Sequence, residues 1–501
     1  YAFAGGDIGV YNDGDVHAVS MDGFAVGIRA QAGGYGDVYV GNDGTVRAQA
    51  EGDAIGIGAY AMAGDVEVFA SGNVTAVSTS STGDADSAGI RAESDFYYGG
   101  GDVYVGVDSG TVVSATSTAS ATGADAYAAG IQAFAYGDVT VVNDGTVTGS
   151  ATASLVAAAS RNAYAAGMYL SSAYGDIAVY NDGTIRATAT AFDGLAAAVY
   201  LNGDYDTLVE NHGTITATGS DFSHAVLSVG ASDDTVLNYG TMTGSIVTEG
   251  GDDLVVNDGT WNTLGSSDLG DNNDVVFNTA DGVINMTNTS IDLGGWSALP
   301  PPPSGKSGLR QAPISGIAGN QFVNDGLIVV RGDGVIDMGA LNPNAFVNNG
   351  IVDFDDGLPN DALTVYGNLA GDGDLLVDLN AATGASDMLY VEGNVVSGTR
   401  MRVNGHMDTM PTSADDRIDI MRVSGTSTAN VLTVGDITTN ADSFVTFGFG
   451  VVASINTANT ADDVHSLAVS VTGLTGRGAL LASLAPAMQN YWHDSLGSLT
   501  R

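Results

Sequence analysis

Aspartates recur at fixed places along this 501-residue chain, and their carboxylates are its most prominent chemical groups. Gly-Asp pairs begin successive units whose aspartates lie 28 to 38 residues apart, and denser acidic clusters follow at shorter steps. Calcium in proteins is bound by carboxylate and carbonyl oxygens, so the clusters supply its candidate ligands. The Gly-Asp aspartates are Asp7, Asp37, Asp65, Asp102, Asp138 and Asp176, and the calcium candidates are Asp233, Asp234, Asp252, Asp253, Asp271 and Asp274.

The Gly-Asp aspartates also have an interpretation that needs no metal. In register they would lie about 4.8 Å apart, the spacing of neighbouring strands, where like charges repel. This repulsion is relieved if each carboxylate accepts backbone N–H groups at its own turn and faces water. Because the glycine periodicity of calcium-binding β-rolls is not kept, the second interpretation is favoured, and no cofactor other than calcium is expected.

Serine and threonine concentrate in three neighbouring units, whose steps of 36 to 38 residues exceed those of the other units. Insertions at one repeated position of a solenoid stack on one face, which is often the binding face. We therefore expect a ridge that contacts glycans or a second copy of the chain. A regular threonine lattice is not expected, because Thr-x-Thr is not kept in step from unit to unit. The ridge residues are Ser80, Thr82, Thr116, Thr118, Thr122, Thr148, Ser150 and Thr152.

The tripeptide Arg331-Gly332-Asp333 has the composition of an integrin-binding motif. Apolar residues on both sides predict a turn between two strands. In a chain this rich in Gly and Asp the tripeptide also arises by chance, so receptor binding here is a subordinate hypothesis.

No set of catalytic residues emerges from the sequence. The runs 108–110 and 493–496 resemble serine-hydrolase motifs, but the first stands where other units have a turn and the second closes the chain. The histidines lack metal-ligand spacing and are expected at turns or on the surface. A β-helix glycosidase with paired carboxylates is an alternative, but the favoured prediction is that the chain is not an enzyme. The histidines are His17, His212, His224, His406, His465 and His493.

A turn phrase of the type Val-x-Asn-Asp-Gly repeats through the chain, and such self-similarity predicts a solenoid. In one unit, the apolar alternations at 37–40, 45–50 and 54–60 predict three strands and three turns per coil. The chain is therefore predicted to be all-β, a right-handed parallel β-helix of about a dozen coils. Stacked amides are expected at Asn12, Asn42, Asn143, Asn181, Asn211, Asn238 and Asn257.

The charge is strongly unbalanced, with 14 Lys plus Arg against 58 Asp plus Glu and a net charge of −44. This excludes nucleic acid and anionic bilayers as partners on electrostatic grounds. The absence of cysteine excludes disulfides and thiolate metal sites. The chain opens in mid-repeat without Met or a signal peptide, so we expect it to be a piece of a longer protein.

Composition divides the chain into five segments. The repeat array covers 1–293, a Pro/Gly-rich loop insertion 294–316, and further coils 317–359. The residue pattern differs over 360–474, which we take as a separate segment. In the last segment, 475–501, Leu and Met at helical spacing predict a short terminal α-helix.

Residues 363–378 (LTVYGNLAGDGDLLVD) and 386–393 (SDMLYVEG) resemble the pertactin-like module of autotransporters. The resemblance implies a β-helical autochaperone cap over 360–474 and a linker helix leading to an outer-membrane β-barrel after Arg501. It further implies an extracellular passenger anchored at the outer membrane of a Gram-negative bacterium.

These observations predict an adhesin or aggregation (biofilm) factor that makes multivalent contacts along a rigid acidic rod. Its partners would be host or bacterial surface glycans or proteins. The alternatives are a self-associating surface-array or fibre subunit, bridged by calcium, and the β-helix glycosidase.

Overall fold

The computed structural model describes residues 1–21, 23–95, 99–121, 123–153, 162–294, 319–339, 344–409, 416–439, 445–455, 462–474, 477, 479–480 and 482–484. Thr122, the 493–496 run and nearly all of the predicted loop at 294–316 lie outside these residues. The chain forms two compact units. Unit 1 comprises Tyr1–Leu327 and Ile336–Ala345, and unit 2 comprises Ile328–Val335 and Phe346–Arg501.

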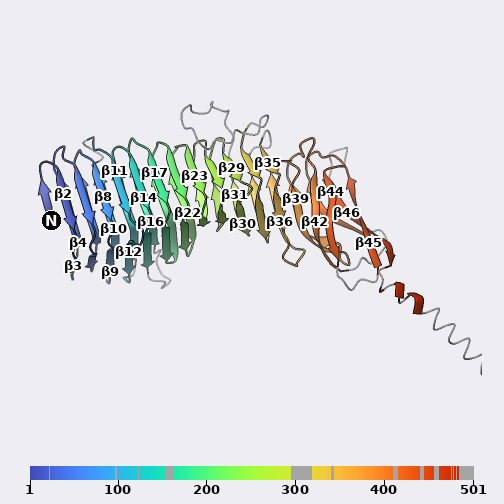
Figure 1. The fold of residues 1–501 in the computed structure, drawn as a ribbon, viewed down its shortest axis with the longest axis horizontal. Helices are drawn as coiled ribbons and strands as arrows, with labels where there is room; N and C mark the ends of the chain where they lie inside the picture. The colour runs from blue at the N-terminus through green and yellow to red at the C-terminus, as the bar shows by residue number, and fades with distance from the viewer. Residues whose placement is uncertain are drawn as a thin grey trace, which may run out of the picture. The chain divides into compact units, whose positions relative to one another are not determined.

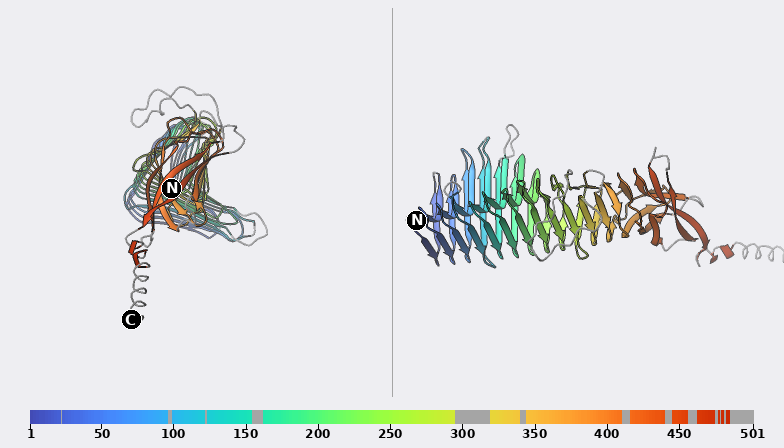
Figure 2. Two further views of the ribbon diagram at one scale, coloured as in Figure 1. Left: turned by 90° about the vertical axis from the view of Figure 1, so that its right-hand side faces the viewer. Right: turned by 90° about the horizontal axis from the view of Figure 1, so that it is seen from above.

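Unit 1 is a parallel β-helix, which confirms the predicted fold class (Figure 1). Each coil contributes one strand to each of three parallel sheets, here called A, B and C. In the second coil these strands are β5, β6 and β7, close to the three predicted alternations. Figure 2 shows the successive coils side by side.

The strands of unit 1 follow in spatial order within each sheet. Sheet A contains β1 (Ala2–Ala4), β4 (Ala25–Ala32), β7 (Ala54–Ala61), β10 (Ala85–Ser94), β13 (Ala126–Ala135), β16 (Asn162–Ser172), β19 (Asp193–Asn202), β22 (Phe222–Val229), β25 (Ser245–Val247), β28 (Ser266–Asp268) and β31 (Ser290–Asp292). Sheet B contains β2 (Ile8–Asn12), β5 (Val38–Asn42), β8 (Val66–Ala70), β11 (Val103–Val107), β14 (Val139–Asn143), β17 (Ile177–Asn181), β20 (Thr207–Asn211), β23 (Asp234–Asn238), β26 (Leu254–Asn257), β29 (Val275–Asn278) and β32 (Gln321–Asn324). Sheet C contains β3 (Val16–Ser20), β6 (Val46–Ala50), β9 (Val74–Ser80), β12 (Val112–Ala119), β15 (Thr146–Ala153), β18 (Thr184–Thr190), β21 (Thr214–Gly219), β24 (Thr241–Thr243), β27 (Thr260–Asn262) and β30 (Val283–Thr287).

Alternate residues of each strand point inward and form the core. In β6, for example, Val46, Ala48 and Ala50 are fully buried, whereas the residues between them face outward. Many of the buried side chains of the first coils are Ala or Val. At Gly56 an added Cβ would lie 2.4 Å from Cγ1 of Val74 and 2.5 Å from the carbonyl oxygen of Gly89, so only glycine fits there.

The longer coils gain their extra residues mainly as strand. Strands β9, β12 and β15 have seven or eight residues where β3 and β6 have five. The insertions expected to form a ridge beyond sheet C therefore extend sheet C itself. The strands of unit 1 that follow residue 232 have only three to five residues.

The predicted asparagine ladder is confirmed. From Asn143 to Asn324 each Nδ2 donates to Oδ1 of the next coil's asparagine at 2.7–2.8 Å, and Asn12 does the same to Asn42. Ala70 and Val107 occupy the ladder position in two coils and interrupt it. Oδ1 of Asn143 consequently has no hydrogen-bond partner among the described residues although it is buried.

Unit 2 begins as parallel strands and ends antiparallel. Its parallel pairs run β36–β39–β42–β44 and β37–β41–β43, whereas β43, β46 and β45 pair antiparallel. Strands β33 (Leu327–Arg331), β34 (Asp333–Asp337) and β35 (Ala345–Asn348) have residues in both units. The others are β36 (Ile351–Asp353), β37 (Ala362–Tyr366), β38 (Asn368–Ala370), β39 (Asp374–Asn380), β40 (Ala385–Ser386), β41 (Met388–Val391), β42 (Met401–Thr409), β43 (Asp416–Val423), β44 (Leu432–Thr439), β45 (Val445–Ser454) and β46 (Asp463–Leu474).

The described residues of the last segment, 477, 479–480 and 482–484, are helical, which agrees with the predicted short helix. Within the described part of the chain, no helix has the length and apolarity needed to cross a membrane.

Candidate interaction surface

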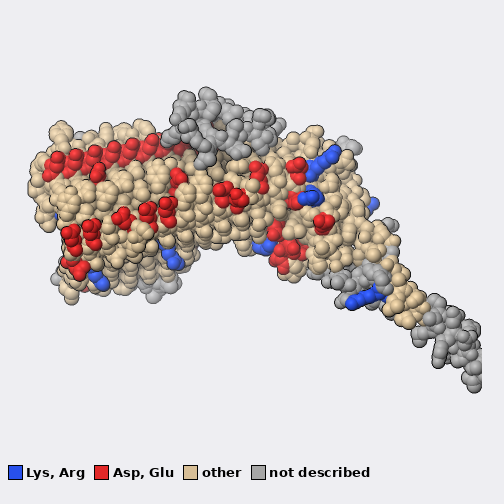
Figure 3. Space-filling model, in the orientation of Figure 1, with Lys and Arg blue, Asp and Glu red and all other residues tan. Residues whose placement is uncertain are grey.

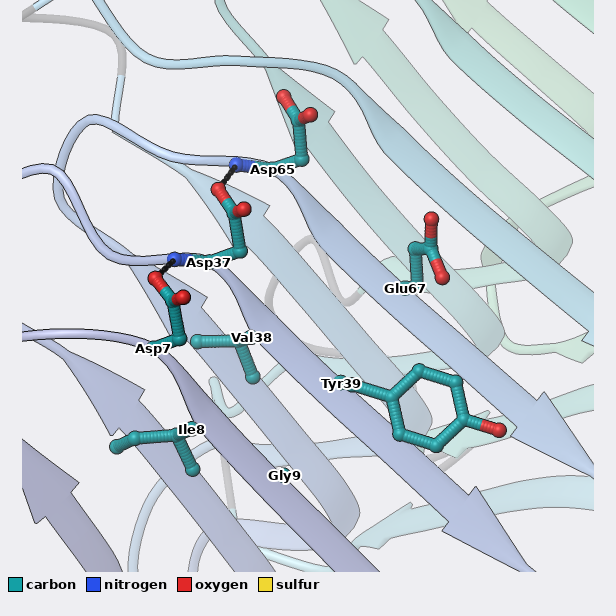
Figure 4. Close-up of a pocket in the computed structure, with 8 residues that line it drawn as sticks. All are labelled: Asp7, Ile8, Gly9, Asp37, Val38, Tyr39, Asp65 and Glu67. Carbon is teal, nitrogen blue, oxygen red and sulfur yellow. Dashed lines mark hydrogen bonds between the residues drawn. The ribbon is translucent and has the colours of Figure 1, made fainter.

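The Gly-Asp aspartates form a continuous ladder along the outside of unit 1. Oδ1 of each of the first five, Asp7 to Asp138, accepts the backbone N–H of the next aspartate at 2.8–3.1 Å (Figure 4). The prediction that each carboxylate bonds at its own turn is therefore wrong, because the donor belongs to the following coil. The aspartates face water as predicted, and acidic residues form rows along this unit in Figure 3. The backbone dipole that each carboxylate faces offsets the repulsion between neighbours.

A shallow hollow of about 310 Å³ lies beside the start of this ladder. Asp7, Asp37 and Asp65 line it together with Tyr39 and Glu67 from strands β5 and β8 (Figure 4). Its charged groups are all acids, so the hollow has no cation to hold a polyanionic substrate.

An aromatic strip, which the sequence analysis missed, crosses the outer face of sheet B. The rings of Tyr11, Tyr39, Phe69 and Tyr104 follow one another with centroids 5.1, 5.7 and 5.2 Å apart. They cover glycines of adjacent strands, and an added Cβ at Gly41 would lie 3.3 Å from two of these rings. The sequence contains a pattern that could have predicted this strip, because a glycine lies two positions from the aromatic residue in three of these strands. The strip shields bare backbone, which is a structural role for its rings.

The outer face of sheet C carries hydroxyl groups in register, contrary to the expectation that Thr-x-Thr drifts. Thr116, Ser150, Thr188 and Thr218 form one column, and Thr118, Thr152 and Thr190 form another. Of the 18 outward residues on β9, β12, β15, β18 and β21, which we call the hydroxyl face, 15 are Ser or Thr. The face comprises Thr75, Val77, Thr79, Val112, Ser114, Thr116, Thr118, Thr146, Thr148, Ser150, Thr152, Thr184, Arg186, Thr188, Thr190, Thr214, Thr216 and Thr218.

This face differs in charge from the rest of the chain. Arg186 is the only ionisable residue among these 18 described positions, although the whole chain has 58 acidic residues. Neighbouring coils place the hydroxyls about 4.8 Å apart, and alternate residues of a strand place them about 6.7 Å apart. Apart from Arg186, the face is therefore a two-dimensional array of uncharged hydrogen-bond donors and acceptors.

The predicted ridge residues mostly belong to this face. Thr116, Thr118, Thr148, Ser150 and Thr152 are among its members, and Thr82 is exposed in the turn after β9. Ser80 does not belong to it, because its side chain is only 6% exposed and its Oγ accepts the backbone N–H of Gly83. Thr122 lies outside the described residues.

The calcium candidates separate into an outer and an inner column. Asp233 and Asp252 are outer, and each accepts a backbone N–H from the next coil at 2.8 and 3.2 Å. Asp271 is exposed at a turn. The inner aspartates, Asp234, Asp253 and Asp274, are 2%, 2% and 0% exposed. The described residues contain no group of three or more His, Cys, Asp or Glu side chains arranged to hold a metal ion.

Burial shifts the titration of the inner aspartates upward. It raises the pKa of Asp234 to about 6, of Asp253 to about 8 and of Asp274 to about 9, and neighbouring carboxylates add to the increase. Oδ2 of each has no hydrogen-bond partner among the described residues. This difference could not be predicted from the residue types, because adjacent aspartates of one Asp-Asp pair face water and core respectively.

The Arg-Gly-Asp tripeptide lies at the predicted strand-to-strand turn. Gly332 has a φ of 74° and separates β33 from β34. The guanidinium of Arg331 donates to the backbone carbonyls of Asp353 and Asp355 at 2.9 Å, so it is engaged within unit 2. The receptor hypothesis for this tripeptide remains a prediction.

A Ser-His-Asp cluster occurs in unit 2, and the sequence analysis missed it. Oγ of Ser427 lies 2.8 Å from Nε2 of His465 and 2.7 Å from Oδ2 of Asp463. Nδ1 of His465 has no partner among the described residues, so the carboxylate contacts the hydroxyl instead of orienting the imidazole. This order differs from that of a nucleophilic triad. The Ser427 N–H also donates to Asp463 at 3.0 Å, so the cluster joins the 425–428 loop to β46.

The expectation that every histidine lies at a turn or on the surface is wrong for His465. Its side chain is fully buried, and burial lowers its pKa below the usual value of 6.5. His17 and His212 are exposed as expected, His224 and His406 are partly buried, and His493 lies outside the described residues.

Comparison of the chain with protein-family models and with curated proteins finds no match.

Proposed function

We propose that this chain is the cell-surface passenger of an autotransporter and acts as an adhesin that binds neutral glycans on the hydroxyl face. The observation that supports this proposal most is the in-register array of 15 Ser and Thr residues on a face with one ionisable side chain. The family assignment rests on the sequence motifs at 363–378 and 386–393, and the surface location follows from it.

The chemistry of the face fits neutral sugars. Serine and threonine hydroxyls donate and accept hydrogen bonds, as sugar hydroxyls do, and their columns repeat along the rod. A single exposed hydroxyl contact is weak, but many equivalent contacts raise the affinity through effective concentration. The acidic ladder and the net charge of −44 repel anionic polymers, so the partner is expected to be uncharged.

The test is binding of the fluorescently labelled chain to beads of neutral and anionic polysaccharides. We expect retention on neutral glycans and none on the anionic ones at low ionic strength. The triple variant Thr116→Glu, Ser150→Glu, Thr188→Glu places three carboxylates in one column of the face and should weaken retention by at least about tenfold, or 1.4 kcal/mol.

The matched control places the same charges on sheet B. Thr140, Ala178 and Leu208 are outward residues on three consecutive coils, in one register column. The triple Glu variant at these positions introduces the same column of like charges but should bind as the parent does. Equal binding by both variants would refute the role of the hydroxyl face.

Self-association is distinguished by sedimentation of the parent chain with chelator and with millimolar calcium. A reversible, calcium-dependent increase in mass would favour the array subunit instead, because bridging between acidic rods requires a divalent ion.

A further inference from the structure

The inner column of carboxyl groups in unit 1 contains buried oxygens without hydrogen-bond partners among the described residues, and the proposed function does not explain them. Asp253 and Asp274 precede β26 and β29, two coils at the centre of Figure 1. Oδ1 of each is satisfied, since it accepts the backbone N–H of the preceding coil's aspartate at 2.8 and 2.9 Å. Oδ2 of each is buried and has no partner among the described residues. An ionised oxygen in that position would lose its hydration without compensation.

The same column continues with asparagines, which identify what Oδ2 faces. Asn320 and Asn344 occupy the equivalent places before β32 and β35, and their Oδ1 atoms accept the same kind of N–H bond at 3.0 Å. Nδ2 of Asn320 donates to the carbonyl oxygens of Leu293 and Gly294 at 2.6 and 3.1 Å. The second atom of this side chain therefore acts as a donor to the preceding turn.

The turns concerned share one backbone feature. Each has a residue at positive φ in the same place, namely Glu249 at 56°, Gly270 at 84°, Gly294 at 70° and Gly339 at 70°. In three of them the N–H of this residue donates to Oδ1 of the aspartate two positions earlier at 2.8–2.9 Å. The turns before Asp253 and Asp274 have a second residue at positive φ, Gly251 at 129° and Asn272 at 98°.

By register, the carbonyls of Leu269 and Gly270 are placed relative to Asp274 as those of Leu293 and Gly294 are relative to Asn320. The carbonyls of Thr248 and Glu249 hold the same place relative to Asp253. Each of these two already accepts one backbone N–H, and a carbonyl oxygen can accept a second hydrogen bond.

We propose that Asp253 and Asp274 are held as neutral carboxylic acids whose Oδ2–H groups donate to these turn carbonyls, so that the coils from β23 to β29 form an alkali-sensitive lock. A protonated carboxyl group has the same donor and acceptor arrangement as the asparagine amide. A calcium ion does not fit, because it requires 2.3–2.6 Å to each oxygen, whereas the Asn320 contacts leave room for a hydrogen bond only.

The surrounding charges favour the neutral form. Asp233 and Asp234 act on Asp253, and Asp252, Asp253 and Asp268 act on Asp274. All of these are acids, and burial, the largest cause, shifts both pKa values upward, to about 8 and about 9. The Thr248 hydroxyl near Asp253 and the backbone N–H group bound to each carboxyl oppose this increase without cancelling it. Asp234 differs because Thr207, Ser228 and Ser232 donate to its Oδ1, so its pKa of about 6 lies lower and we leave it out of the lock.

The sign of the pH dependence follows from these directions. The folded state binds both protons more tightly than the unfolded chain does, so stability decreases as the pH rises above about 4. The decrease continues up to the folded pKa values of about 8 and 9 and then levels off. Within that window each acid raises the unfolding constant about tenfold per pH unit, and the two together about a hundredfold.

The test compares the full chain with the variant Asp253→Asn, Asp274→Asn between pH 5 and pH 10. Urea unfolding is followed by tryptophan emission, which includes Trp261, a fully buried residue of β27 among these coils. We expect the parent to lose stability with a slope two protons steeper than that of the variant, and the variant to be the more stable protein at pH 8. The control Asp233→Asn, Asp252→Asn changes the outer column and should keep the parent's slope between pH 5 and pH 7. Its slope should level off at a lower pH than the parent's, because Asp233 and Asp252 raise the pKa values of Asp253 and Asp274.

Infrared difference spectra at pH 7 give a second readout. The variant should lack C=O bands of protonated carboxylic acids that the parent has, whereas the control should lack only carboxylate bands. Equal pH slopes in parent and variant, or loss of carboxylate bands only, would overturn the proposal. Stabilisation of the parent by calcium that chelator reverses and the variant lacks would do the same, since it would assign the site to a cation. If the double variant fails to fold, Asp274→Asn alone should halve the slope difference.

Discussion

The asparagine ladder makes a quantitative prediction for Asn211→Ala. Asn211 receives the amide of Asn181 at 2.7 Å and donates its own to Asn238 at 2.8 Å, and all three side chains are buried. The substitution removes both bonds, each contributing about 1 kcal/mol, and leaves Oδ1 of Asn238 without a donor at a cost of about 1–3 kcal/mol. The coils around β20 should therefore lose about 3–5 kcal/mol of stability. The same situation occurs naturally where Val107 replaces an asparagine in the ladder, because Oδ1 of Asn143 in the next coil then has no partner among the described residues.

Hydrogen exchange measured by mass spectrometry suits this prediction, because a solenoid opens locally and need not unfold as one unit. Backbone amides of β17, β20 and β23 should exchange faster in Asn211→Ala by the factor that corresponds to the lost free energy. The matched control is Asn202→Ala, which makes the same change at the end of β19, in the preceding coil and outside the ladder. A loss within about 0.5 kcal/mol of that control, the usual range for surface substitutions, would refute the energetic role of the ladder.

Two further substitutions test features of the fold. Gly56→Ala should destabilise unit 1 by about 2 kcal/mol or more, because its Cβ would meet Val74 and the Gly89 carbonyl at 2.4–2.5 Å, whereas Gly14→Ala, with open space around its Cβ, should be neutral in thermal unfolding. His465→Gln should remove acid sensitivity from unit 2: burial lowers the histidine pKa, so its stabilising contribution is complete above pH 6.5 and lost as the pH falls below that value. Urea midpoints at pH 5 and pH 7.5 should therefore differ less in the variant than in the parent, and an unchanged difference would contradict the assignment.

The repeated turn phrase was sufficient to predict the three-strand coil and the asparagine stack, because both depend on residues at constant distance from one turn. The hydroxyl face could not be predicted in this way. The structure pairs Val107 with Asn143 and Ser114 with Thr148. Yet Ser114 lies seven residues after Val107, whereas Thr148 lies five residues after Asn143. The turn in the earlier coil is two residues longer, and an even insertion keeps the same residues facing outward. Register is thus set by turn length, which the spacing of motifs conceals.

The ionisation of the acidic residues depended on contacts that the sequence does not display. Asp252 and Asp253 are adjacent and chemically identical, yet one faces water and the other the core. His465 similarly lies on a strand between two antiparallel partners, and it pairs with Ala453, 12 positions earlier, and with Met421, 44 positions earlier. Burial of a single polar side chain is decided by such distant pairings, so neither the pKa shifts nor the Ser427 cluster could be anticipated.

The hydrogen bonds of the two aspartate columns differ in direction. In the outer ladder the acceptor always belongs to the earlier coil, so a coil added in chain order meets an oxygen already in position. In the inner column the acceptor belongs to the later coil, and Asp234 and Asp253 must wait for the coil that follows before their N–H groups are satisfied. The coils from β23 to β29 are therefore joined by carboxylates in both directions. Their outer aspartates accept from the following coil, whereas the backbone N–H groups of their inner aspartates donate to it.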